Sequence, residues 1–264
     1  MGKIVVITAQ NLASLNIVRP VLESLGSEIE SLIVTPNLPI RNWHDIKRIA
    51  RLVSKTCLPF IAFKLLEIDF YSLLVRWKGE DANELARRSG VKVKRFTTPN
   101  MPECVDYLKQ VRPDYIVNTG PGLISKEVIG LSRVATLNCH GAKLPEYRGP
   151  ANYVWTLLNG DTSHHVTIHR MVSKLDAGPV WTEMAFPIDQ AWSVYRYNYE
   201  AARRAGKFLA DTLKKILSGG ESFSERVQDE ARAVKRSFPT RSDIRRLRSK
   251  GIRLVTMRDV FDCI

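Results

Sequence analysis

Runs of apolar and β-branched residues alternate with more polar, helix-like segments along the first 190 residues. The apolar runs predict strands at residues 3–8, 29–35, 91–96, 114–118, 133–138, 166–171 and 180–186. The intervening segments predict helices at residues 14–25, 81–89, 101–111 and 151–158, and a long helix follows at residues 193–217. Strands buried on both faces and alternating with helices indicate an α/β fold, a mostly parallel twisted sheet with helices on both faces.

Residues 40–78 exceed what a minimal sheet domain of this kind requires. Residues 58–77 are strongly apolar, but a membrane span is disfavoured by the interior charges at Lys64, Glu67, Asp69 and Arg76. The favoured interpretation is a pair of helices packed over the sheet edge, and the alternative is an interfacial helix with basic flanks. In the second case the basic residues available to meet phosphates are Arg41, Lys47, Arg48, Arg51, Lys55, Arg76 and Lys78.

The chain divides into a main domain, residues 1–190 with the insertion at 40–78, and a shorter part, residues 191–264. The second part begins with a long helix that closes the main domain. This helix ends at Gly219-Gly220, and a basic C-terminal extension follows it. Basic residues dominate this extension, at Arg232, Lys235, Arg236, Arg241, Arg245, Arg246, Arg248, Lys250, Arg253 and Arg258.

Charge and cysteine content restrict the partner and the compartment. The 264 residues carry a formal net charge of +13, which favours an anionic partner such as a nucleotide phosphate, a phospholipid surface or RNA. A solvated basic surface without a specific partner is the alternative. Four scattered cysteines indicate free thiols, and no signal peptide is expected at the start of the chain, so we predict a cytoplasmic protein.

Three polar residues stand where acyl-transfer chemistry would need them. Asn138 and His140 lie two residues apart at the carboxyl end of a predicted strand, so they point the same way, and Asp176 lies on a tight turn between two strands. An amide and an imidazole can stabilise the oxyanion of a tetrahedral intermediate. A carboxylate can accept the proton of an attacking amine and can hold His140 protonated.

Two glycines follow the strand at residues 114–118. Gly120 and Gly122 either let a ligand approach the backbone or form a plain tight turn. The first strand lacks the glycine-rich turn of dinucleotide-binding enzymes, because Ala9, Gln10 and Asn11 follow it, and this disfavours a dehydrogenase.

The motifs around these residues resemble the signature of folate-dependent formyltransferases. They are Asn138-Cys-His140-Gly-Ala-Lys-Leu144-Pro-Glu-Tyr147-Arg148-Gly149, Asn159-Gly-Asp161, Val166-Thr-Ile-His169 and Leu175-Asp176-Ala-Gly178-Pro179. The resemblance implies 10-formyltetrahydrofolate as donor and a primary amine as acceptor. It also implies that Asn138 and His140 polarise the formyl group, while Asp176 orders a water and takes part in proton transfer.

Further site residues follow from the same resemblance. We expect Gly120, Gly122, Leu144 and Pro145 to bind the folate, and Tyr147, Arg148 and Gly149 to form a substrate loop. Arg148 either pairs with a carboxylate of the protein or meets an anionic substrate.

The chain departs from the family pattern at two places. Gly141-Ala142 replaces a common serine after the histidine, and His164-His165 replaces a common Thr-Gly. A metal site formed by His164, His165 and His169 is disfavoured, because no second carboxylate or cysteine stands at ligand spacing, so we predict no metal.

The predicted acceptor is a small amine, most simply an amino sugar on a nucleotide or lipid phosphate, with peripheral membrane contact as an option. Methionyl-tRNA formylation is the runner-up, although the extension is short for the β-barrel of tRNA-formylating members and has few strand-like runs. Transfer of a related one-carbon or carbamoyl group and non-catalytic binding of folate or a membrane partner are the remaining alternatives.

Overall fold

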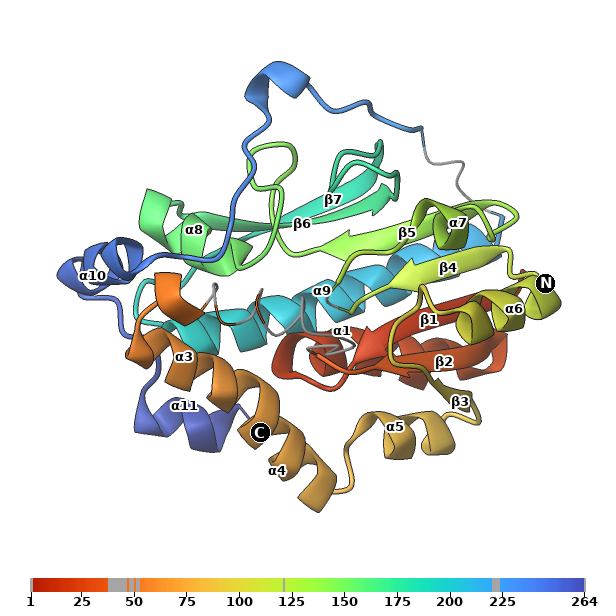
Figure 1. Cartoon of the computed structure of the whole chain (residues 1–264), viewed down its shortest axis with the longest axis horizontal. Helices are drawn as coiled ribbons and strands as arrows, with labels where there is room; N and C mark the ends of the chain where they lie inside the picture. Colours follow the sequence, from red (N-terminus) through yellow and green to blue (C-terminus); the bar gives the residue numbers. More distant parts are fainter. Residues whose placement is uncertain are drawn as a thin grey trace.

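The protein is built around one seven-stranded sheet with the strand order β3-β2-β1-β4-β5-β6-β7 (Figure 1). The computed structural model describes residues 2–37, 47, 50, 53–120, 122–219 and 224–263. The strands are β1 (Ile4–Ala9), β2 (Ile29–Thr35), β3 (Lys92–Arg95), β4 (Tyr115–Asn118), β5 (Ala135–His140), β6 (Ser163–Arg170) and β7 (Val180–Pro187). Strands β1 to β5 pair in parallel, whereas β6 pairs antiparallel with both β5 and β7, so the predicted mostly parallel sheet is confirmed.

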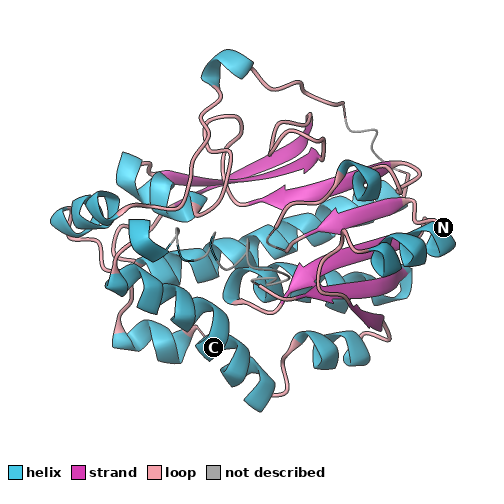
Figure 2. Ribbon diagram, in the orientation of Figure 1, coloured by secondary structure: helices cyan, strands magenta, loops and turns pink. Residues whose placement is uncertain are grey.

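Helices cover both faces of the sheet (Figure 2). Side chains of β1 alternate between two cores: Ile4 and Val6 pack on the side of α1 (Leu12–Leu25) and α9 (Val194–Leu217), and Val5 and Ile7 pack on the side of α6 (Pro102–Val111). The remaining helices of the main domain are α5 (Ala82–Arg88), α7 (Lys126–Ile129) and α8 (Asn152–Asn159). This two-sided burial explains why β1 is apolar at every position except Thr8.

The long helix α9 lies directly against α1. A Cβ added at Gly206 of α9 would sit 2.6 Å from the carbonyl oxygens of Asn16 and Ile17 in α1, so only glycine permits this approach. The helix begins at Ser193, whose hydroxyl accepts from the backbone N–H of Arg196. The two helices therefore belong to one core, and a domain division at residue 190 stays a prediction from the sequence.

Residues 58–77 of the insertion are helical throughout. They form α3 (Leu58–Leu65), one π turn η2 (Leu66–Phe70) and α4 (Tyr71–Trp77). One face is buried on the core, where Lys64 and the buried Glu67 form an ion pair at 2.5 Å. The charges that interrupt the apolar run are thus partly neutralised inside the protein. The basic positions Arg41, Arg48 and Arg51 of the predicted flank lie outside the described residues.

The basic extension crosses the sheet end before it forms helices (Figure 1). Arg226 pairs with Val180, and Lys235 pairs with Arg148, with the short turn η3 (Glu230–Arg232) between them. Two helices follow, α10 (Arg241–Ser249) and α11 (Met257–Asp262), which the charge pattern did not predict. Both helices begin with a capping box, formed by Thr240 with Asp243 and by Thr256 with Asp259. A threonine followed three residues later by an aspartate was therefore the sequence signal that could have predicted these two helices.

Candidate active site

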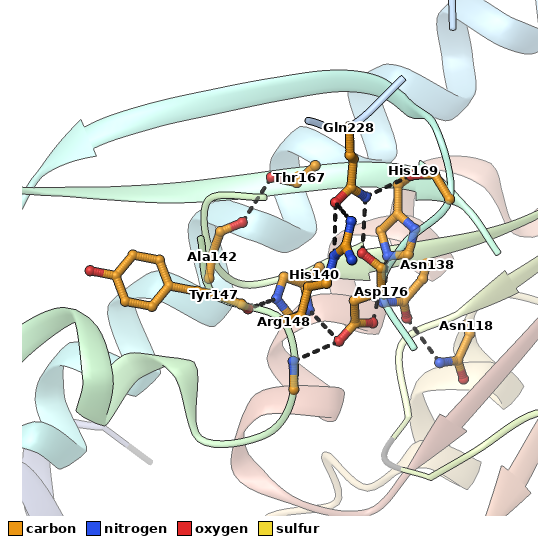
Figure 3. Close-up of polar contacts among 12 residues, drawn as sticks. Asn118, Asn138, His140, Ala142, Tyr147, Arg148, Thr167, His169, Asp176 and Gln228 are labelled. Carbon is orange, nitrogen blue, oxygen red and sulfur yellow. Dashed lines mark hydrogen bonds and ion pairs between the residues drawn. The ribbon is translucent and has the colours of Figure 1, made fainter. Parts of the chain in front are cut away.

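Asn138, His140 and Asp176 lie together at the carboxyl end of β5 (Figure 3). The antiparallel hairpin of β6 and β7 brings Asp176 back over this end, and the turn places Asp176 at a φ of +48°, in the left-handed region. His140 Nδ1 lies 3.7 Å from Asp176 Oδ2, and both side chains are nearly buried. Such a left-handed non-glycine residue is held by its surroundings at a cost of about 1–3 kcal/mol, a pattern that is frequent at functional sites.

The hydrogen bond on the far side of His140 determines which nitrogen faces the carboxylate. His140 Nε2 lies 2.7 Å from the carbonyl oxygen of Tyr147, and because a carbonyl only accepts, Nε2 carries a proton and donates. Nδ1 therefore faces Asp176, and it donates toward the carboxylate when the ring is an imidazolium. The pair can thus hold a cation beside the position where negative charge develops during acyl transfer.

His169 orients the amide of Asn138. His169 Nδ1 donates to the carbonyl oxygen of Arg170 at 3.0 Å, so its Nε2 accepts from Asn138 Nδ2 at 3.2 Å. On the other side, Asn118 Nδ2 donates to Asn138 Oδ1 at 2.9 Å. This chain of bonds fixes the amide with its NH₂ group toward His169 and leaves one N–H of Asn138 for a ligand.

His169 also contacts the carboxylate of Asp176, with Nε2 3.8 Å from Oδ1. Burial, followed by the neighbouring His140, lowers the pKa of His169 to about 4. The ring is therefore neutral at physiological pH and acts as a hydrogen-bond acceptor. From the sequence, we considered His169 only as part of a motif and of a disfavoured metal site. His169 pairs with Asn138 where β5 and β6 run antiparallel, and this pairing brings it next to Asn138 and Asp176.

Gln228 in the C-terminal extension connects the turn at Asp176 to Arg148, and sequence reasoning missed it. Its Nε2 donates to the carbonyl oxygens of Asp176 at 2.9 Å and Gly178 at 2.7 Å. Its Oε1 accepts from Arg148 Nη2 at 2.8 Å, and Glu230 also accepts from the buried Arg148 guanidinium. Of the two roles expected for Arg148, the structure shows the pairing with a protein carboxylate.

The loop after β5 contributes backbone as well as side chains. The backbone N–H of Gly149 donates to Asp176 Oδ2 at 2.9 Å, which brings this predicted loop residue into contact with the carboxylate. Tyr147 instead directs its hydroxyl to Asp161 at 2.5 Å, away from the cluster of Asn138, His140 and Asp176. Leu144 is buried, and its bond to Pro145 is cis.

The two predicted glycines lie beside this cluster at the end of β4. The carbonyl oxygen of Gly120 accepts from Asn118 Nδ2 at 3.2 Å, so Gly120 is two hydrogen bonds away from Asn138. Gly122 has a φ of +113° and open space where a Cβ would stand. The backbone at Gly122 therefore borders open space, whereas a Cβ at Gly120 would lie 3.2 Å from the backbone of Thr8.

The remaining histidines do not join a metal cluster in the described part of the chain. His164 is buried, with Nδ1 2.5 Å from the Tyr197 hydroxyl, and burial lowers its pKa to about 3. His165 lines a separate cleft of about 530 Å³ with Lys143, Glu146 and Arg236. Among the described residues, no group of three histidine, cysteine, aspartate or glutamate side chains is arranged to hold a metal ion. Burial likewise raises the pKa of Cys139 to about 12, which argues against a nucleophilic thiol.

A second cleft, of about 690 Å³, opens at the carboxyl ends of β1 and β2. Its lining includes the amides of Gln10 and Asn37 and the guanidinium groups of Arg76 and Arg95. Cα pairing places β1 beside β4, so this cleft and Asn118 lie at the same edge of the sheet. Ligands of open α/β sheets bind at this edge.

Comparison with known proteins agrees with this arrangement. Residues 95–213 match the Formyl transferase family. Glycinamide ribonucleotide transformylase 1 from Symbiobacterium toebii has a similar structure, with a TM-score of 0.59 and 16% identity over 87% of this chain and 95% of that chain. The sugar 3N-formyl transferase WlaRD gives a TM-score of 0.57 at 16% identity, over 90% of this chain and 70% of that chain.

An N-formyltransferase from Helicobacter canadensis, solved with folinic acid and dTDP-3-aminofucose, gives a TM-score of 0.55 at 17% identity. The similarity covers 90% of this chain and 71% of that chain. At these identities the structural similarity establishes the fold, and the family match adds the chemistry of formyl transfer. The predicted resemblance is confirmed over residues 95–213, which match the Formyl transferase family and contain Asn138, His140 and Asp176.

Proposed function

We propose that this enzyme transfers a formyl group from 10-formyltetrahydrofolate to the primary amine of an amino sugar carried on a nucleotide or lipid phosphate. The observation that carries the proposal is the convergence of Asn138, His140 and Asp176, with their hydrogen bonds, at the ligand-binding edge of the sheet. Among the structurally similar proteins, WlaRD is a sugar 3N-formyl transferase, and the N-formyltransferase from Helicobacter canadensis was solved with dTDP-3-aminofucose.

The proposed mechanism assigns one task to each group. The free N–H of Asn138 donates to the formyl oxygen as the amine attacks the formyl carbon. His140, whose ring nitrogens face the Tyr147 carbonyl oxygen and Asp176, holds that carboxylate in place beside the reacting groups. Asp176 accepts the proton of the attacking amine, directly or through a water, and a proton passes to the folate nitrogen as its bond to the formyl carbon breaks. The products are the N-formyl acceptor and tetrahydrofolate, so atoms and charge balance.

The residues present suit a folate donor. The cluster supplies the free N–H of Asn138 for the formyl oxygen, and the accessible backbone near Gly122 supplies an edge for a flat heteroaromatic ring. We propose that Gly120, Gly122, Leu144 and Pro145 hold the donor. Arg148 is engaged with Gln228 and Glu230, so we assign it to holding the site rather than to contacting the acceptor.

The second cleft is the proposed acceptor site. Arg76 and Arg95 can pair with phosphate oxygens, and the amides of Gln10 and Asn37 can bind sugar hydroxyls. Asp69 and Asp81 also line this cleft, and they can accept from hydroxyl groups or from the acceptor amine. This mixture of charges suits a phosphorylated amino sugar better than a purely anionic ligand.

The test is an assay of tetrahydrofolate formation from 10-formyltetrahydrofolate with separate acceptors. The acceptors are nucleotide-linked amino sugars, lipid-extracted amino glycans and charged methionyl-tRNA. Turnover with a sugar acceptor, lost in Arg95→Ala with the folate affinity unchanged, supports the proposal. Turnover with methionyl-tRNA alone would show that the acceptor is a tRNA and not an amino sugar. Turnover with a carbamoyl donor but with no formyl donor would show that the transferred group is carbamoyl.

A further inference from the structure

The helical run α3–η2–α4 has an unusual outer face, made of large apolar side chains that no part of the described chain covers. Their exposed fractions are high: Leu58 80%, Leu65 55%, Phe70 40%, Leu73 65% and Trp77 81%. The opposite face is buried on the core through Phe60, Phe63, Glu67, Tyr71 and Val75. Twenty helical residues span about 30 Å, so the exposed face is a long stripe.

The π turn at η2 keeps this stripe on one side of the helix. Leu58, Leu65 and Leu73 are separated by seven and eight residues, and a strict α-helix would rotate the third away from the first two. A π turn is wider than an α turn and absorbs about one extra residue. The side chains of both faces therefore stay aligned along the whole run.

Basic residues stand at both ends of the stripe. Lys55 precedes α3, and Lys78 follows Trp77; both are exposed. Lys64 is turned inward to Glu67 and Tyr153, so it does not interrupt the apolar face. Apolar residues with a terminal tryptophan and flanking lysines are the pattern of a helix that lies in the headgroup region of a bilayer.

A second exposed apolar pair lies on α11. Met257 and Phe261 are each 75% exposed, stand four residues apart on one helix face, and flank the exposed Arg258. Both helical regions pack against the first turn of α9: Phe63 of α3 meets the Tyr195 ring edge-on at 6.4 Å, and Asp259 of α11 accepts from Ser193.

We propose that the outer face of α3–η2–α4 binds the surface of a bilayer that contains anionic phospholipid. None of the helices in the described part of the chain has the length and apolar character of a membrane span. The proposed contact is therefore with the bilayer surface. A second copy of the chain fits the face less well. The chain carries a net charge of +13, and a face-to-face pair would bring lysine-flanked stripes together, whereas anionic headgroups complement them.

The position of the stripe links membrane binding to the proposed acceptor site. Ile68, Ser72 and Arg76 of the same helices line the cleft proposed for the acceptor. A helix resting on a membrane would hold that cleft near the lipid headgroups. Membrane binding itself does not depend on the proposed reaction, so the two proposals can fail separately.

Vesicle sedimentation tests the proposal. The full-length protein is mixed with vesicles of phosphatidylcholine alone or of phosphatidylcholine and phosphatidylglycerol in equal parts. The test variant combines Leu65→Ser, Leu73→Ser and Trp77→Ser, and the matched control combines Leu123→Ser, Val134→Ser and Val227→Ser, three exposed apolar positions elsewhere. We expect binding to the anionic vesicles, weakened about tenfold or more in the test variant and unchanged in the control.

A charge variant separates the contribution of the apolar stripe from that of the flanking lysines. Lys55→Glu with Lys78→Glu should weaken binding to anionic vesicles and leave the weaker binding to phosphatidylcholine unchanged. Binding that survives the triple serine variant would overturn the role of the stripe and leave only a general basic attraction. A concentration-dependent dimer that the triple serine variant abolishes, without vesicle binding, would assign the face to a second copy.

Discussion

The side-chain amide of Gln228 donates to the backbone carbonyl oxygen of Asp176 at 2.9 Å, across 52 residues of sequence. This bond holds the C-terminal extension against the turn at Asp176, and the same side chain accepts from Arg148. Asp176 has left-handed backbone geometry, so its position depends on such contacts. The extension is therefore part of the active-site scaffold.

Gln228→Met should lower kcat by about tenfold and reduce the free energy of unfolding by about 1–3 kcal/mol. The substitution keeps the volume but removes the hydrogen bonds to the carbonyl oxygens of Asp176 and Gly178 and to Arg148. Steady-state kinetics and urea unfolding measure the two effects. Val227→Ala, at an exposed neighbouring position, should change neither. A wild-type kcat in Gln228→Met would remove the positioning role.

Asp176→Asn should abolish most turnover, by about 10²–10⁴-fold, because an amide cannot take the amine proton. The amide oxygen can still accept from the Gly149 N–H, so we expect an intact fold by circular dichroism. Asp106→Asn, an exposed carboxylate on α6, is the control and should retain full activity. Unchanged activity in Asp176→Asn would contradict the assigned role.

Stability should fall when the pH is lowered from about 6.5 to 5. Burial lowers the pKa of His164 to about 3 and that of His169 to about 4, below their ordinary value of 6.5. Across this window the unfolded chain takes up protons that the folded chain refuses, so unfolding becomes easier by at most about 1.4 kcal/mol per pH unit for each histidine.

Urea unfolding at several pH values measures this slope. His164→Gln keeps a hydrogen-bonding side chain opposite Tyr197 and removes one of the two titrating groups, so the slope should shrink by roughly half. An identical slope in the variant would show that His164 binds its proton equally in both states.

Gly178→Ala should unfold or severely destabilise the protein. A Cβ at this position would lie 1.8 Å from the carbonyl oxygen of Arg170, a backbone atom that cannot rotate away. Gly130→Ala, where the nearest atoms lie at 3.5 Å, is the matched control. Thermal unfolding of both variants measures the difference, and equal midpoints would mean that the turn after Asp176 relaxes freely.

The local sequence pattern was sufficient to predict the sheet, and it singled out Asn138, His140 and Asp176 as candidate site residues. Strand β1 is apolar at nearly every position because both faces of the sheet are covered, and this produces a run that local pattern recognises. Asn138 and His140 share one strand, and Asp176 lies in a short motif, so nearby residues were enough to select them as candidates.

The contacts that hold these groups in place come from the tertiary structure. Asn118, His169 and Gln228 reach the site from three separate segments, through strand pairing and a returning C-terminal extension, and no local pattern encodes those contacts. The tautomers of His140 and His169 likewise depend on carbonyl groups that the fold brings to their rings. Local sequence specifies periodicity and turn chemistry, whereas the hydrogen-bond partners of a side chain depend on distant parts of the chain, which meet only when the core packs.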